Sequence, residues 1–93
     1  MAKRNTYRNL VIEYYARNSS SVKAITGRCW PAEEPHSQPH LAQLLSEKAG
    51  WEVDYRSLSR QLRRIGPGDV LVRKRIQELI YDPQLYLTDH GNG

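Results

Sequence analysis

The sequence predicts one mainly helical domain with a small β-hairpin near its C-terminal end. Apolar residues recur at i, i+3, i+4 and i+7 in successive segments, which is the pattern of amphipathic helices. Breaks rich in glycine and proline separate these segments. The last apolar segment, residues 85–88, is short and follows an Asp-Pro turn signal, which is typical of a hairpin strand. A wholly helical domain is the alternative.

Length and composition set the broad class. Ninety-three residues suit one domain, which we expect to span residues 1–93 with mobile ends at 1–4 and 90–93. The 39% hydrophobic content favours a folded chain over a disordered one. A single cysteine excludes an intrachain disulfide, and no apolar run is long enough to cross a membrane. We expect a cytoplasmic, nucleoid-associated protein without membrane contact, or a nuclear one in a eukaryote.

The first helix is predicted to begin at Asn5 or Thr6 and to end near Asn18. Its apolar stripe consists of Tyr7, Leu10, Val11 and Tyr14. Ile12 and Tyr15 lie outside that stripe. Such a second apolar edge favours contact with another subunit, although a wide core-facing stripe explains it equally well.

Residues 19–38 are the hardest to interpret. Residues 22–26 fit either a short strand or a helical turn that ends at Gly27. Three prolines and two glutamates then predict an irregular loop. A loop of this length inside a small domain often has a role of its own.

The second helix is predicted to open with Pro39, since the missing N–H of proline costs nothing in a first turn. Gly50 ends it, because glycine tolerates the left-handed conformation that follows many helices. Trp51 and Val53, in the following turn, are expected to wedge between two helices. The buried face of the helix is predicted to comprise Leu41, Leu44, Leu45 and Ala49.

A basic helix is predicted over residues 54–65, with Asp54 as its N-cap. One face is apolar and is formed by Tyr55, Leu58, Leu62 and Ile65. At 100° per residue the opposite face carries four arginines, with two serines at its edges: Arg56, Arg60, Arg63, Arg64, Ser57 and Ser59. No acidic residue lies on the helix beyond its cap, whereas a merely solvated face usually mixes charges of both signs.

The charge distribution favours a polyanionic partner. The chain has a net charge of +4 and a pI near 9.5. Residues 54–75 contain seven basic and two acidic residues, a balance of +5, so the rest of the chain has a net charge of −1. Positive charge is therefore concentrated at the basic helix and the segment after it.

The segment 70–81, beyond the Gly66-Pro67-Gly68 break, fits two structures. Its apolar residues alternate as in a strand, with Lys74 as an interruption. They also fit a helix capped by Asp69, whose buried face would comprise Val72, Ile76, Leu79 and Ile80. The sequence does not decide between strand and helix for this segment.

The order of these elements resembles a winged helix-turn-helix domain. The run Leu87-Thr88-Asp89-His90-Gly91 is similar to the Leu-Thr-x-x-Gly that ends the wing in bacterial repressors of the multiple-antibiotic-resistance type. The resemblance covers about residues 39–91. The helix–turn unit is longer here than in compact bacterial examples, and the Asp-x-Arg pattern of the wing tip is missing.

The resemblance implies double-stranded DNA as the partner. The helix 54–65 would enter the major groove, with Arg56, Ser57, Ser59 and Arg60 nearest the bases. Arg63 and Arg64 would contact phosphates. Arg73, Lys74 and Arg75 would lie on the wing and touch the flanking backbone or minor groove, and Lys3 and Arg4 would form an N-terminal arm. Many such proteins are homodimers, for which the first helix would supply the surface.

Catalysis and metal binding are not expected. His36 and His40 have a zinc-ligand spacing, but with Cys29 they give three ligands where a closed structural site needs four, so His90 or a glutamate would have to complete it. No phosphate loop, carboxylate pair or nucleophile motif occurs, so we expect no enzyme, metal or cofactor. The hypothesis is a small sequence-specific DNA-binding protein, a transcriptional regulator. The alternatives are a winged-helix adaptor or phage-type inhibitor that grips an acidic protein surface and, with less support, an RNA-binding protein.

Overall fold

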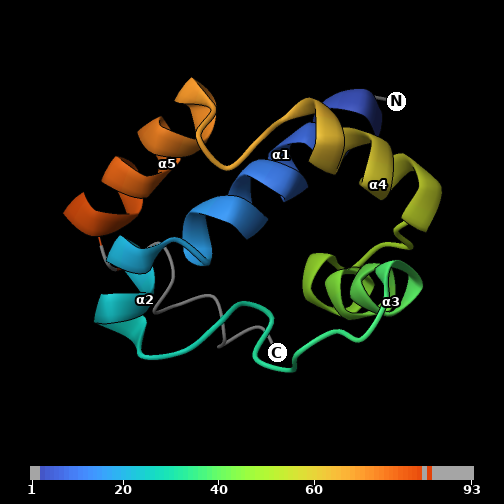
Figure 1. The fold of residues 1–93 in the computed structure, drawn as a ribbon, viewed down its shortest axis with the longest axis horizontal. Helices are drawn as coiled ribbons and strands as arrows, with labels where there is room; N and C mark the ends of the chain where they lie inside the picture. Colours follow the sequence, from blue (N-terminus) through green and yellow to red (C-terminus); the bar gives the residue numbers. More distant parts are fainter. Residues whose placement is uncertain (1–2, 83, 85–93) are drawn as a thin grey trace.

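The computed structural model describes residues 3–82 and residue 84, together with the side chains of this range from Thr6 onward. This part of the chain is mainly helical and contains no strand (Figure 1). No helix within it is long and apolar enough to cross a lipid bilayer. The helices are α1 (Lys3–Arg17), α2 (Ser20–Thr26), α3 (Gln38–Ala49), α4 (Tyr55–Arg64) and α5 (Val70–Tyr81).

Helix α1 is the centre of the arrangement. Helices α4 and α5 both pack against it and lie apart from each other in Figure 1, with α1 between them. Helix α3 packs against α4, and the short α2 packs against α5 and α1. The molecule therefore has a three-helix part formed by α1, α3 and α4, to which α2 and α5 are added on the other side.

Side-chain caps and glycines end the helices where the sequence predicts. The carboxylate of Asp54 accepts the Ser57 backbone N–H at 3.1 Å at the start of α4, which satisfies one donor that the helix cannot pair itself. Pro39 lies in the first turn of α3, after the cap Ser37. Gly27 and Gly50 follow α2 and α3 with φ of 76° and 83°, a left-handed conformation that suits glycine.

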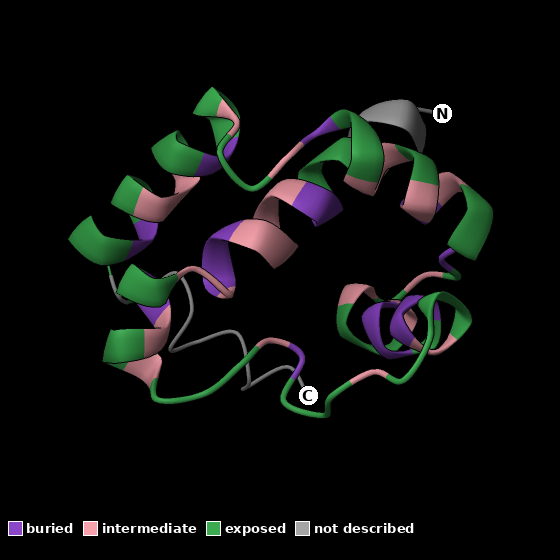
Figure 2. Ribbon diagram, in the orientation of Figure 1, coloured by how far each residue is buried: buried purple, intermediate pink, exposed green. Residues whose placement is uncertain are grey.

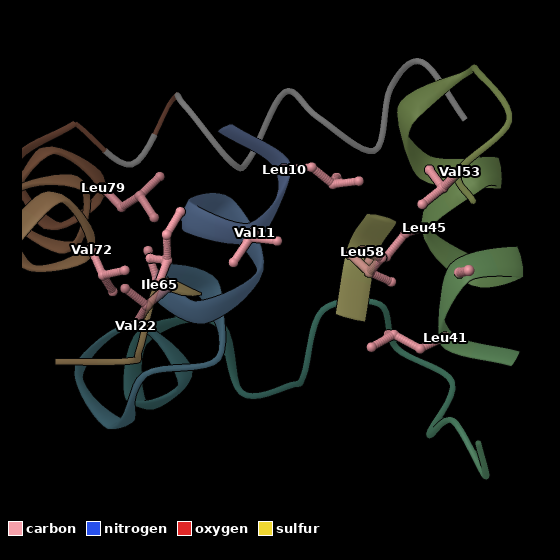
Figure 3. Close-up of a cluster of buried hydrophobic side chains, with 12 residues drawn as sticks. Leu10, Val11, Val22, Leu41, Leu45, Val53, Leu58, Ile65, Val72 and Leu79 are labelled. Carbon is pink, nitrogen blue, oxygen red and sulfur yellow. The ribbon is translucent and has the colours of Figure 1, made fainter. Parts of the chain in front are cut away.

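One apolar core joins all five helices (Figure 3). Its fully buried large side chains are Leu45, Leu58, Leu79, Val11, Val22 and Val72. Leu58 is the only one that α4 supplies in that set, and Leu79 and Val72 come from α5. Full burial of one leucine stabilises a fold by about 1.5–3 kcal/mol, so Leu58 is a main anchor of α4.

The segment 70–81 is a helix, and the predicted β-hairpin is not supported. Asp69 caps it through a 2.8 Å hydrogen bond from the Leu71 backbone N–H. A helix brings Val72 and Leu79 onto one buried face, whereas a strand would turn Lys74 to the same side as Val72. The strand predicted at 85–88 and the Leu-Thr-x-x-Gly motif lie outside the described residues.

The segment 22–26 takes the helical of its two predicted forms, in a helix that Ser19 caps and that starts at Ser20. Two further expectations need correction. Helix α1 begins at Lys3, ahead of the predicted caps and within the end predicted to be mobile. Tyr55, which was predicted to be buried, is 40% exposed.

The second apolar edge of α1 lies inside this chain's own fold. Ile12 and Tyr15 are partly buried and pack against the core. The Tyr15 hydroxyl donates a 3.0 Å hydrogen bond to the Leu62 carbonyl of α4. These contacts give both residues an intramolecular role, and the homodimer stays a prediction.

Candidate nucleic-acid interface

Helix α4 is held by contacts at both ends and along one side. At its start, the Tyr7 hydroxyl of α1 accepts the Asp54 backbone N–H at 2.8 Å. The Tyr7 ring also meets Trp51 edge-on, with 5.1 Å between the ring centroids. Toward its end, Tyr15 bonds to the Leu62 carbonyl, and Ile65 is buried beyond the last turn. The opposite face of α4 is left toward solvent (Figure 2).

The four arginines predicted on that free face are all exposed, namely Arg56, Arg60, Arg63 and Arg64. None of them forms an ion pair with an acidic residue in the described part of the chain. Four guanidinium groups on one ten-residue helix repel one another, which a polyanion bound to that face would relieve. The face therefore carries an excess of positive charge that the described part of the chain does not neutralise by ion pairs.

Arg56 has a partner on its own helix. Its guanidinium carbon lies 5.8 Å from the centroid of the exposed Tyr55 ring. Hydrogen bonding to the Tyr55 side chain, together with the charge of Asp54, raises the pKa of Arg56 above its usual value. Tyr55 thus holds a permanently charged group near the start of α4.

The two serines of the predicted interface already have partners in the protein. The Ser57 hydroxyl donates to the Asp54 carboxylate at 3.2 Å as part of the helix cap. The Ser59 hydroxyl donates to the Gln38 amide oxygen at 2.7 Å and so ties α4 to the start of α3. Both serines position α4, and their predicted contact with bases stays a prediction.

The basic residues of α5 do not form a wing, because that segment is helical. Arg73 and Lys74 are exposed on α5, on the far side of α1 from α4. Arg75 is partly buried and donates to Glu13 of α1 at 2.8 Å and to Glu78 at 2.9 Å. Burial lowers the pKa of Arg75, but its hydrogen bonds to Glu13 and Glu78 outweigh burial and raise it.

Glu13 also binds Arg17, and sequence reasoning missed this network. Arg17 is the one buried charged residue in the described chain, and its Nε is 2.5 Å from a Glu13 oxygen. Its guanidinium lies over Trp30, 5.1 Å from the ring centroid. The i, i+4 spacing of Glu13 and Arg17 was the available signal. Nothing in the spacing indicates that Arg75 completes the network from α5.

Two hollows flank α4. One, of about 720 Å³, opens at its start, and its lining includes the exposed carboxylates of Glu47, Glu52 and Asp54. The other, of about 520 Å³, lies among α1, α3 and α4, with Arg63 as the one charged residue in its lining. Negative charge thus borders the start of α4 and positive charge its later turns. Phosphates are favoured beside the later turns.

The loop before α3 and the first turn of α3 bring three possible metal ligands together. Ligand atoms of Glu33, His36 and His40 all lie within 4.8 Å of one another. Cys29, which sequence reasoning grouped with the two histidines, is exposed and does not belong to this set. The sequence offered a glutamate as a further ligand but could not single out Glu33, because an irregular loop gives no periodicity from which its position follows.

Comparisons with known proteins identify no relative of this chain. No family model, no curated protein and no solved structure matches the chain. The resemblance to winged-helix repressors therefore rests on the sequence pattern alone.

Proposed function

We propose that this protein is a small sequence-specific DNA-binding protein, a transcriptional regulator of helix-turn-helix type in which α4 enters the major groove. The observation that carries the proposal is the row of four exposed arginines on α4, without an acidic partner in the described chain. The protein acts through charge and groove fit rather than through catalysis.

The arrangement of α1, α3 and α4 supports this proposal. Helix α4 follows α3 after a short connection, packs against it and is braced by α1 from behind. A recognition helix needs such bracing, since its side chains must keep their register against the base edges. With α5 helical, the proposal takes the all-helical form, and residues 70–81 contribute no wing.

The polarity of the surface suggests how α4 divides its contacts. Arg56 and Arg60 both point away from the buried Leu58, each at two residues or about 200° around the helix. Because Arg56 already contacts the Tyr55 ring, Arg60 is our candidate for bidentate binding to guanine O6 and N7. Arg63 and Arg64, away from the carboxylates at the start of α4, are our candidates for phosphate contacts.

The test starts with fluorescence anisotropy on a labelled random-sequence duplex at two salt concentrations. We expect binding that weakens steeply as salt rises, because each neutralised phosphate releases counterions. A duplex selected from a random library then serves to compare variants. Arg60→Ala is expected to cost about 1–3 kcal/mol of binding free energy on that duplex and to relax preference at one base position.

Arg28→Ala is the matched control, since it removes the same charge from an exposed residue just after α2, away from α4. It should bind the selected duplex nearly as well as the wild type. Absence of binding at low salt, or equal loss in both variants, would contradict the proposal. A stoichiometric protein partner that survives nuclease treatment and depends on Arg60 would favour the protein-interaction alternative instead.

A further inference from the structure

The start of α3 and the loop before it form a cluster that DNA binding does not use. His36 and His40 stand on either side of the cap Ser37, and their rings stack with 3.9 Å between centroids. The His40 Nε2 atom lies 3.3 Å from a carboxylate oxygen of Glu33. We propose that Glu33, His36 and His40 bind a divalent transition-metal ion, with Zn²⁺ as the best fit.

The ligand types suit zinc. Two imidazoles and one carboxylate form a known three-ligand set that leaves a fourth position for water. Ligand atoms on one tetrahedral zinc ion are about 3.3 Å apart, given bond lengths near 2.0–2.1 Å. The present limit of 4.8 Å therefore has to shrink by roughly 1.5 Å. Rotation of the exposed His36 and Glu33 side chains can supply this movement, while the partly buried His40 stays in place.

Zinc binding has two costs that follow from the geometry. The His40 Nδ1 atom accepts the His36 backbone N–H at 3.1 Å, so the proton of the neutral ring lies on Nε2. Zinc at Nε2 moves that proton to Nδ1 and ends this hydrogen bond. The positive end of α3 also opposes the cation.

These costs weaken the site but do not abolish it. With one ligand fewer than a structural zinc site and the two penalties above, we expect a dissociation constant on the order of micromolar. The consequence of binding is local: zinc would fasten the loop that carries Glu33 to the first turn of α3.

The experiment is calorimetric titration of the full chain with zinc chloride. We expect one equivalent to bind, with a rise in the melting temperature when zinc is in excess. Glu33→Gln and His36→Ala are expected to weaken binding at least about tenfold, which is 1.4 kcal/mol or more. Both residues are exposed, so these variants should fold. His40→Asn removes Nε2 but keeps an acceptor for the His36 backbone N–H. This variant should therefore lose zinc binding while the hydrogen bond at the start of α3 is kept.

Glu34→Gln is the matched control, since Glu34 is the exposed neighbour of Glu33 and lies outside the cluster. It should bind zinc like the wild type. The cobalt-loaded protein should lack the charge-transfer band of a thiolate ligand, because Cys29 takes no part. No zinc binding below about millimolar concentration, or equal binding by Glu33→Gln, His36→Ala and Glu34→Gln, would overturn the proposal. Both of these results concern zinc binding alone and do not depend on whether the protein binds DNA.

Discussion

Helices α4 and α5 look alike in sequence and differ in what their charges do. Both are amphipathic, both pack on α1 and both carry several basic residues. On α5, Arg75 is partly buried and bonded to Glu13 and Glu78. On α4, all four arginines are exposed without an acidic partner in the described chain.

The difference separates charge that supports the fold from charge that is free for a partner. A guanidinium group bonded to Glu13 cannot bind a phosphate without breaking contacts that join α1 to α5. The arginines of α4 have no such contact to break. A count of basic residues over 54–75 combines these two kinds of charge, so it overstates the positive charge that is available to a partner.

The largest effect is expected from the buried leucine that each of the two helices contributes to the core. Leu58 of α4 and Leu79 of α5 are both fully buried, and Leu58→Ala and Leu79→Ala should each lower the free energy of unfolding by about 2–5 kcal/mol. That is a large part of the 5–15 kcal/mol typical of small domains. Urea unfolding followed by circular dichroism measures it. A loss under about 1 kcal/mol at Leu58 would mean that α4 is not docked as described.

The next effect tests the contrast in charge directly. Glu13→Gln removes the charge that binds both Arg17 and Arg75, and should lower the free energy of unfolding by about 1–3 kcal/mol. Arg60→Ala should change it by no more than about 0.5 kcal/mol, because Arg60 is exposed and makes no such contact. Equal losses in the two variants would erase the distinction between α4 and α5.

The smallest effect concerns the hydrogen bond from Tyr15 of α1 to the Leu62 carbonyl of α4. Burial first, then the nearby Tyr14, raises the pKa of Tyr15 above 10.0, so the folded state holds its proton more tightly than the unfolded state. The contribution of Tyr15 to the free energy of unfolding is therefore constant below pH 10 and is lost as pH rises through the folded pKa of Tyr15. Tyr15→Phe should flatten this fall and cost about 1 kcal/mol at neutral pH, through loss of the bond to Leu62. Urea unfolding midpoints at pH 8 and above pH 10 measure both effects. An unchanged fall of the midpoint with pH in Tyr15→Phe would show that Tyr15 is not the group that titrates.

Local patterns predicted much of the fold. Asp54, Pro39 and Gly50 act at helix ends as expected, because capping depends on a few neighbouring atoms. The exposed arginine row follows from the position of Leu58 and helical geometry alone. For residues 70–81 the sequence left strand and helix open, because their apolar residues fit both periods, and packing against α1 and α2 decides for the helix.

The sequence by itself determined helices α3 and α4, their caps and the one-sided charge of α4, since all of these arise from interactions within a few residues. Tertiary structure alone decided which charges remain free. It brought Arg75 to Glu13, 62 residues away, and Ser59 to Gln38, 21 residues away. It also brought Glu33 and His36 of the loop before α3 close to His40 of that helix. The physical reason is that such pairings depend on how helices pack, and no local pattern along the chain encodes that.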